Sequence, residues 1–422
     1  MTTTHTVTTP HNSQPESLIE DVYATIIEFV VHDDPDPPRA LLSMRLVSRT
    51  WNLIILNCSR LWTRFQISHD LGQPFDARLR DLFQMLKQSR DHLLDLSFRV
   101  TDIEMVDADP LAPPIRAAQR LLADEGINSR LQFLDLELPR LEFSDVHRSL
   151  STQNHQVLFP HLESLSIELT PQSNQPNQEI VLQMFRLQSF SAHCPNLRRL
   201  WLANPTEVRT LQDRAQFPWY QLTHLTIRDT DRDKGPLRPI MLVLPSCVQL
   251  EVCDVTFAGW TSPLAVVQQV QLLPKLLTFT VTAEQDPYLD PVLSAFTMPN
   301  LTTLATNFSP QPGPIWNGEC LAQTLTACFQ RSGFRLQQFT MTHVDCNTNA
   351  LVGFLGLSQI RELHLVNCTV EENALEVATQ QSEGLQHLDV RISSMSAKRK
   401  RDEGPFAFGE VPPRSAKRRR HD

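Results

Sequence analysis

The chain of 422 residues is poor in the residues that build catalytic loops. It has only 12 glycines, and none of them belongs to a phosphate-binding G-x-x-x-x-G-K-S/T loop, a G-x-G-x-x-G turn or a G-x-S-x-G nucleophile elbow. The H-E-x-x-H zinc motif is absent too, and the 14 histidines are scattered along the chain. We therefore expect a protein that is not an enzyme in its own right and that uses no cofactor.

The eight cysteines contain no C-x-x-C pair, and most of them lie among apolar residues. This spacing favours buried, reduced thiols over disulfides or zinc ligands, so we expect no metal site. No stretch approaches the roughly 20 apolar residues that span a bilayer. The first residues, "MTTTHTVTTPHNSQPES", lack the basic start and apolar centre of a secretory signal. We expect no contact with a membrane and a location in the nucleus, with the cytoplasm as a further compartment.

Negative charge dominates the chain but is unevenly distributed. The net charge is −9, and residues 398–422 contain nine Lys or Arg against four Asp or Glu, which is +5. The rest of the chain therefore carries −9 − 5 = −14. Nucleic-acid binding depends mainly on Lys and Arg that neutralise phosphates, so an acidic body argues against broad contact with DNA or RNA.

Two basic clusters lie in the last 30 residues. They are "KRKR" and "KRRR", separated by a stretch that contains three prolines. Such clusters on a chain without fixed structure are typical of nuclear-import signals, which bind an import receptor; a solubilising or nucleic-acid-touching tail is the alternative. The residues concerned are Lys398, Arg399, Lys400, Arg401, Lys417, Arg418, Arg419 and Arg420.

A repeated L-x-x-L-x-L pattern runs from about residue 93 nearly to the end of the chain. Eleven matches begin at Leu93, Leu131, Leu162, Leu197, Leu222, Leu250, Leu276, Leu301, Leu336, Ile360 and Leu385. Successive starts are 38, 31, 35, 25, 28, 26, 25, 35, 24 and 25 residues apart. Six of these ten spacings fall within the range of about 20–29 residues of a leucine-rich repeat, and the longer ones leave room for insertions.

Helical spacing occurs between some of these matches, in residues 178–194 and 318–333. A unit of strand, loop and helix cannot bury its apolar face alone and must stack on its neighbours. The fold class predicted is therefore α/β: an irregular leucine-rich-repeat solenoid with parallel strands on the concave side and helices on the convex side. Long inserts at 170–178 and 228–239 are expected to be exposed loops.

Strand periodicity predicts which residues face the concave side. Positions four and six of each motif should point into the core, and positions three, five and seven should face outward. For two successive motifs these outward positions are Arg199, Trp201 and Ala203, then His224, Thr226 and Arg228. Trp201 beside arginine is a typical binding hot spot, or else it is covered by the insert that follows it. We expect Arg199, Trp201, His224 and Arg228 to contact an unknown protein substrate.

The N-terminal part has a different, purely helical pattern. Residues 1–16 are rich in Thr, His, Pro and Ser and are expected to lack fixed structure. Apolar spacing predicts an amphipathic helix from about Leu18 that stops at "HDDPDPP", and a second helix from about Arg39. The segment 46–62, "LVSRTWNLIILNCSRLW", has an apolar stripe on a helical period that is wider than a lone surface helix needs. This width indicates contact with a core and with a partner.

Residues 18 to about 65 resemble an F-box. The resemblance depends on "LIEDVYATIIEFV" followed by "ALLSMRLVSRTWNLIILNCSRLW", and the pairing with leucine-rich repeats is most similar to fungal F-box proteins. Ile19 stands where the family usually has Pro, Ser48 stands where it usually has Cys, and the loop between the helices is unusually acidic. The resemblance covers about 50 of the 422 residues.

The resemblance implies an adaptor role. F-box proteins bind the Skp adaptor subunit of a cullin ubiquitin ligase through this module and hold a substrate for ubiquitination with a second domain. The positions that match the family's motif are Leu18, Ile19, Val22, Ile26, Leu46, Val47, Trp51, Leu61 and Trp62. Two alternatives stay open: a helical cap that only seals the first repeat, and a nuclear repeat scaffold that binds protein or RNA without a ubiquitin link. The domains predicted are a disordered start (1–16), an F-box-like module (17–66), a solenoid (67–392) and a disordered basic tail (393–422).

Overall fold

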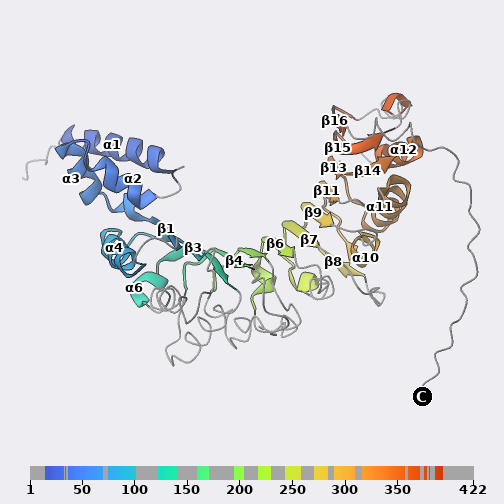
Figure 1. Cartoon of the computed structure of the whole chain (residues 1–422). Coiled ribbons are helices and arrows are strands. Elements are labelled where there is room, and N and C mark those ends of the chain that lie inside the picture. Colours follow the sequence, from blue (N-terminus) through green and yellow to red (C-terminus); the bar gives the residue numbers. More distant parts are fainter. Residues whose placement is uncertain are drawn as a thin grey trace, which may run out of the picture.

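A computed structural model of the chain forms an open arc with a helical module at its N-terminal end (Figure 1). The structure describes residues 15–32, 34, 37–69, 75–100, 122, 124–139, 159–170, 194–203, 217–229, 243–257, 270–283, 289–308, 316–356, 360–370, 375–377, 380 and 385–392. Residues 178–193 of the predicted helix at 178–194, the basic tail and most of the two long inserts lie outside these residues.

Three α-helices and one 3-10 helix make up the module. They are α1 (Pro15–His32), α2 (Pro37–Met44), α3 (Arg49–Asn57) and η1 (Ser59–Trp62). The first helix begins at Pro15, slightly before the predicted start near Leu18. Proline is favoured in the first turn of a helix, which also explains why α2 begins at Pro37 and not at Arg39.

The segment 46–62 is not one continuous helix, and this part of the sequence prediction is wrong. Leu46 and Val47 lie in the turn before α3, and the chain breaks again at Cys58, whose backbone is extended (φ −89°, ψ 92°). Ser48 starts α3 as its N-cap, because its side chain accepts a hydrogen bond from the backbone N–H of Trp51 at 3.1 Å. Because the apolar periodicity continues through the turn at Leu46 and Val47 and through the break at Cys58, the spacing of apolar residues alone could not predict either interruption.

The module has its own buried core, which continues into the first strand. Its buried apolar side chains are Ala24, Ile27, Val31, Leu41, Ile54, Ile55, Leu61, Trp62 and Phe65. The indole Nε1 of Trp62 donates a hydrogen bond to the Ile55 carbonyl oxygen at 2.7 Å. Because η1 contacts α4 (Phe75–Gln88) and α2 contacts β1 (Arg64–His69), the inner face of the module covers the open end of the solenoid.

Fourteen strands of the described residues form one sheet, whose pairs are all parallel. Eleven of them coincide with the eleven predicted motifs: β2 (Leu94–Val100), β3 (Leu131–Pro139), β4 (Ser164–Thr170), β5 (Arg199–Ala203), β6 (His224–Asp229), β7 (Val252–Phe257), β9 (Thr278–Ala283), β11 (Thr303–Phe308), β13 (Gln338–Thr342), β15 (Glu362–Val370) and β16 (His387–Ile392). The other three are β1, β12 (Trp316–Asn317) and β14 (Val344–Cys346). A separate two-stranded sheet pairs β8 (Gln271–Leu272) with β10 (Phe296–Thr297).

Five of the repeats, those that begin at Leu162, Leu197, Leu222, Leu250 and Leu301, enter their strands through the same tight turn. The backbone N–H of the first motif leucine donates to the carbonyl oxygen three residues earlier, as at Leu197 (3.2 Å), Leu250 (3.0 Å) and Leu301 (3.2 Å). Two of these turns are also linked across repeats, because Asn196 and Asn300 donate to proline carbonyls of the preceding repeat at 2.6 Å. This shared entry fixes the register in which the parallel strands stack.

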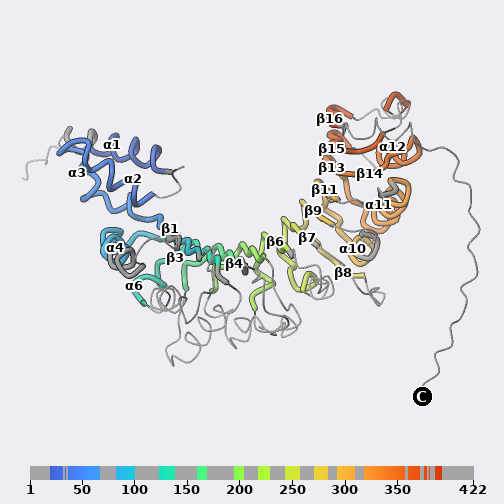
Figure 2. Tube along the Cα trace, viewed as in Figure 1, coloured from blue at the N-terminus to red at the C-terminus, as the bar shows by residue number. Residues whose placement is uncertain are grey.

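Burial alternates along the strands as the motif predicts. In β9 the sequence Thr-Phe-Thr-Val-Thr-Ala alternates between half-buried and buried side chains. The strands follow the concave side of the arc in Figure 2, and the helices lie outside them. The described helices behind the sheet are α4, α6 (Glu125–Asn128), α10 (Leu289–Ala295), α11 (Gly318–Ser332) and α12 (Thr348–Gly356), with short 3-10 turns η4 (Trp219–Gln221) and η5 (Leu244–Ser246). The predicted α/β leucine-rich-repeat solenoid is therefore confirmed, as is the predicted helix over 318–333.

The cysteines are free thiols, and six of the eight are buried. Burial raises the pKa of Cys194 and of Cys247 to about 12, so these thiols are uncharged and unreactive at neutral pH. The part of the chain that the structure describes contains no helix with the length and apolarity to cross a membrane.

Candidate protein-interaction surfaces

Helix α1 presents two apolar stripes on different faces. Tyr23, Ala24, Ile27 and Val31 face the module core. On the other side Val22, Ile26, Phe29 and Val30 recur at helical spacing and are all exposed, with Phe29 the most exposed at 77%. A helix that only sealed the module would need one stripe, so the outer stripe requires another explanation.

The turn between α2 and α3 holds two more apolar side chains outward. Leu46 is 88% exposed and Val47 is 66% exposed. This turn is fixed on both sides, because the Arg45 guanidinium Nε donates to Asn52 Oδ1 at 2.8 Å and Ser48 caps α3. The exposed pair is therefore presented by a defined backbone.

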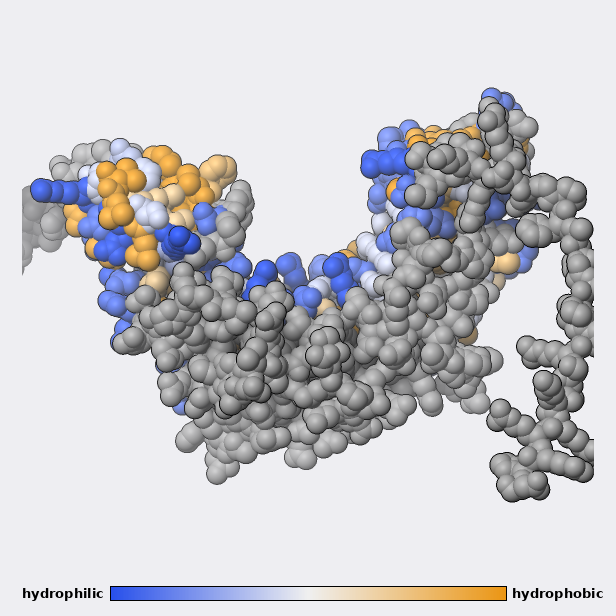
Figure 3. Space-filling model, in the orientation of Figure 1, coloured by the Kyte–Doolittle hydropathy of each residue, from blue (hydrophilic) through white to orange (hydrophobic). Residues whose placement is uncertain are grey.

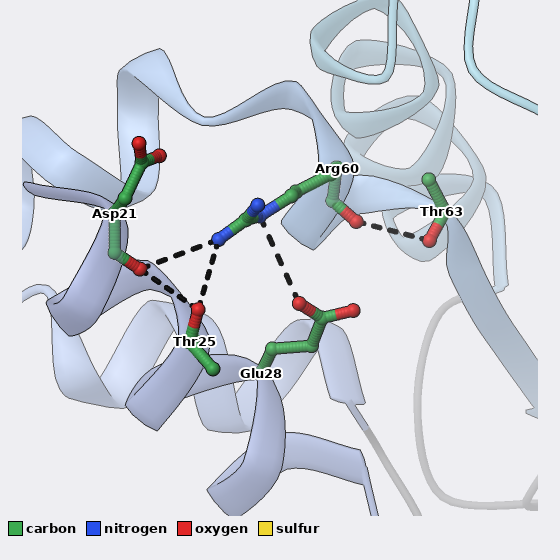
Figure 4. A network of polar contacts seen from close by, with 5 residues as sticks. All are labelled: Asp21, Thr25, Glu28, Arg60 and Thr63. Atoms are coloured by element: carbon green, nitrogen blue, oxygen red, sulfur yellow. Dashed lines mark hydrogen bonds and ion pairs between the residues drawn. The ribbon is translucent and has the colours of Figure 1, made fainter. Parts of the chain in front are cut away.

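A polar network fastens α1 to η1 along a third face of the helix (Figure 4). Arg60 donates to the Thr25 hydroxyl at 3.2 Å and to the Asp21 carbonyl oxygen at 3.4 Å, and its Nε lies 3.7 Å from the Glu28 carboxylate. Arg60 and Glu28 are both partly exposed, so the ion pair itself contributes at most about 1 kcal/mol. The network as a whole holds α1 in the rotation that leaves the outer stripe facing away from the core.

The residues predicted to bind the Skp adaptor divide into three groups. Val22, Ile26, Leu46 and Val47 are exposed, and Trp51 is half-buried against the module core. Leu61 and Trp62 are buried, at 7% and 2% exposure, so in this chain they stabilise the module from within. Leu18 and Ile19 lie in α1, but their side chains are outside the described residues.

Four further exposed apolar residues of the module were not predicted as site residues. They are Phe29, Val30, Leu42 and Leu53. Phe29 and Val30 stand on the same helical period as Val22 and Ile26, and this spacing could have identified them. Figure 3 shows apolar residues gathered over the helical module at one end of the arc. We name the exposed set the module patch: Val22, Ile26, Phe29, Val30, Leu42, Leu46, Val47 and Leu53.

The concave floor of the solenoid is polar, as predicted, with one exception. Arg199 and Arg228 are exposed, and Trp201 and His224 are half-buried. Ala203 is in register with the outward-facing Arg228, so it faces the concave side as predicted, but its short side chain is buried at 5%. The strand register places Arg199 beside His224 and Trp201 beside Thr226.

Ion pairs connect neighbouring strands at the N-terminal end of this floor. Arg64 lies 3.4 Å from the Asp95 carboxylate. Burial raises the pKa of Asp95 by more than the charge of Arg64 lowers it. Arg99 lies 3.4 Å from Asp135 and 3.8 Å from Glu137. Oppositely charged side chains in register therefore neutralise each other along β1, β2 and β3.

The centre of the floor combines an aromatic ring with a paired arginine. The guanidinium Cζ of Arg228 lies 5.9 Å from the centroid of the Trp201 ring, within the range of a cation–π contact. The other side of that guanidinium lies 3.9 Å from the Asp254 carboxylate. The pKa of Asp254 is raised by burial, and Arg228 offsets part of that rise.

His224 adjoins this centre and should be uncharged at neutral pH. Its pKa is lowered from 6.5, first by burial and then by Arg199, while Glu251 acts in the opposite direction. Its Nδ1 lies 2.9 Å from the Thr223 hydroxyl. Since the folded state holds this proton less tightly than the unfolded chain, His224 reduces stability as the pH falls below about 6.5.

We expect the substitution Arg199→Gln to raise the pKa of His224, because it removes the positive charge that opposes protonation. An NMR titration of the His224 imidazole in the full chain measures the shift. Arg361→Gln is the matched control, since Arg361 is equally an exposed arginine but lies near β15. An unchanged His224 pKa in Arg199→Gln would contradict the proximity of the two side chains on the floor.

The floor further along the arc is uncharged. The outward positions of β9, β11 and β13 are Thr278, Thr280, Thr282, Thr303, Ala305, Asn307, Gln338, Thr340 and Thr342. In Figure 3 the floor between the two arms is strongly hydrophilic, and paler residues follow at the foot of the C-terminal arm. Charges return at β15 and β16, where His364 lies 3.8 Å from Glu362 and 3.7 Å from Asp389. No group of metal-ligand side chains occurs in the described ranges.

Comparison with known proteins finds distant likenesses of the fold only. A protein of Bacteroides fragilis is 12% identical, with 68% of this chain and 85% of that chain covered and a TM-score of 0.33. An internalin of Listeria monocytogenes is 13% identical, with 88% and 90% covered and a TM-score of 0.33. TLR13 in complex with a single-stranded RNA is 12% identical, with 70% and 45% covered and a TM-score of 0.29.

No protein-family model matches the chain, and no curated protein matches it. The chain is a leucine-rich-repeat protein on the evidence of its own strands. At such low identities and TM-scores, these neighbours carry no argument about what it binds. Among the described residues, the module patch and the concave floor are the surfaces from which we argue the function of this leucine-rich-repeat protein.

Proposed function

We propose that this protein is the substrate-recognition adaptor of a Skp–cullin–F-box ubiquitin ligase. In this proposal the helical module binds the Skp adaptor, and the concave floor holds a protein substrate for ubiquitination. The observation that carries the proposal is the module patch, which stays exposed on a helical module whose inner face is already packed on the solenoid.

The patch distinguishes an adaptor from a simple cap. Capping uses the inner face of the module, where α2 contacts β1 and η1 contacts α4. That contact leaves Phe29 and Leu46 at 77% and 88% exposure. Burying a large apolar side chain stabilises a complex by about 1.5–3 kcal/mol, so a partner that covered these residues would gain much of its affinity there.

Copurification tests the proposal. The tagged full chain, expressed in a eukaryotic host, is expected to recover the Skp adaptor in a stable complex, and purified adaptor is expected to bind the purified chain directly. Failure of the purified proteins to bind would overturn the adaptor role. It would favour the repeat scaffold without a ubiquitin link.

We further propose that residues 393–422, which lie outside the described residues, direct the protein to the nucleus through their two basic clusters. A fluorescent reporter fused to these residues is expected to accumulate in the nucleus. A companion reporter, in which Lys398–Arg401 and Lys417–Arg420 are all replaced by alanine, should stay evenly distributed. Exclusion of the first reporter from the nucleus would remove this part of the proposal.

A further inference from the structure

In the part of the chain that the structure describes, Arg199 differs from the other arginines of the concave floor in having no carboxylate beside it. Arg64 and Arg99 pair with acids of the neighbouring strands at 3.4 Å, Arg228 pairs with Asp254 at 3.9 Å, and Arg391 pairs with Asp389 at 3.2 Å. Among the described residues, the Arg199 side chain makes no ion pair or hydrogen bond, and it is exposed. One unbalanced positive charge therefore faces the concave space.

An aromatic surface lies beside this charge. Arg199 and Trp201 are two residues apart on β5, so both side chains point to the same face, about 7 Å apart along the strand. The Trp201 ring is packed on one side by Arg228, which Asp254 holds in place. The ring is thus fixed in a position where a second apolar group can contact it.

The neighbours of Arg199 limit the size of the charge that it can bind. His224, in register with Arg199, is held uncharged at neutral pH and adds no positive charge. Glu168 is in register with Ala203, four residues along β5, and Asp254 pairs with Arg228, so neither acid lies beside Arg199. A single guanidinium next to an uncharged histidine matches a carboxylate with one negative charge. A phosphate with nearly two, or a nucleic-acid backbone, would leave negative charge unpaired there.

We propose that Arg199 and Trp201 form the anchor point for an extended substrate peptide, in which Asp or Glu stands two residues from a large apolar side chain. Alternate side chains of an extended peptide are also about 7 Å apart, so one peptide can reach both groups at once. This inference rests on the proposed function for its biological meaning, because it names the substrate class of the proposed adaptor.

Synthetic peptides test the inference on the full chain by fluorescence anisotropy. One ten-residue Ser/Thr peptide carries Asp-Ser-Phe at its centre, and three relatives replace the Asp with Asn, the Asp with phosphoserine, or the Phe with Ala. The Asp-Ser-Phe peptide is expected to bind about tenfold more tightly than each relative, the gain of one charge-assisted hydrogen bond or one aromatic contact.

Variants of the chain assign each part of that gain. Arg199→Gln should remove the preference for Asp over Asn, and Trp201→Ala should remove the preference for Phe over Ala. The control Arg361→Gln should change neither. The inference is overturned if the Asp-Ser-Phe peptide does not bind, if phosphoserine binds more tightly than Asp, or if Arg199→Gln keeps the Asp preference. Since no Skp adaptor enters these measurements, their failure is separate from a failure of the proposed adaptor role.

Discussion

Replacing Leu46 and Phe29 together with aspartate is expected to weaken binding of the Skp adaptor by about 100-fold or more, while the fold of the chain stays intact. Central apolar residues of an interface often contribute 2 kcal/mol or more each, and an unpaired carboxylate buried in their place adds a further penalty. Two such changes exceed the roughly 2.7 kcal/mol that corresponds to 100-fold. Surface plasmon resonance with purified adaptor measures the loss.

The double substitution is chosen so that unfolding cannot mimic the result. Leu46 and Phe29 are the most exposed residues of the module patch, at 88% and 77%. Trp51 is a poorer target, because it packs against the module core and its loss would damage the fold. The matched control is Val248→Asp with Val270→Asp, two exposed valines far along the solenoid.

Each outcome has a clear meaning. The control should bind the adaptor as the unmodified chain does, and both variants should keep the same urea midpoint. Equal adaptor binding by the patch variant and the unmodified chain would show that the patch is not the contact surface. The adaptor proposal would then lose the observation on which it depends.

The solenoid was predictable from sequence because the same short pattern of buried residues recurs in each repeat. Each L-x-x-L-x-L motif specifies two buried positions in a strand, and all eleven motifs became strands of one sheet. β1 escaped prediction because "RFQISH" has no leucine at the repeat spacing; it joins the sheet through its register with β2. The long inserts have no periodic spacing of apolar residues from which a helix or strand could be predicted. Most of their residues lie outside the part of the chain that the structure describes.

The module patch was only partly predictable, because apolar spacing does not say which face is buried. In α1 the stripe of Val22 and Ile26 was read from the sequence, yet the core is formed by Ala24, Ile27 and Val31. Which stripe turns inward is decided by tertiary contacts such as the Arg60 network, between residues about 35 positions apart. The same limit applies to Trp62. Its match to the F-box motif predicts a place at the partner surface, but the structure buries it.

Replacing the buried Trp62 with alanine is expected to destabilise the module by about 3–5 kcal/mol, the usual cost of emptying a large aromatic site. The side chain is 2% exposed, and its indole N–H satisfies the Ile55 carbonyl at 2.7 Å. Trp62→Phe is the matched control: it keeps most of the volume and loses mainly that hydrogen bond, at about 1 kcal/mol. Urea denaturation followed by circular dichroism measures both.

The two sets of variants separate stability from recognition. Trp62→Ala should lose adaptor binding only in proportion to the fraction of the module that is unfolded, and conditions that restore folding, such as lower temperature, should restore binding. The patch variant at Leu46 and Phe29 should remain folded and still fail to bind. If Trp62→Ala kept the unmodified urea midpoint, the module core described here would be wrong. A partner surface that included Trp62 would then have to be considered again.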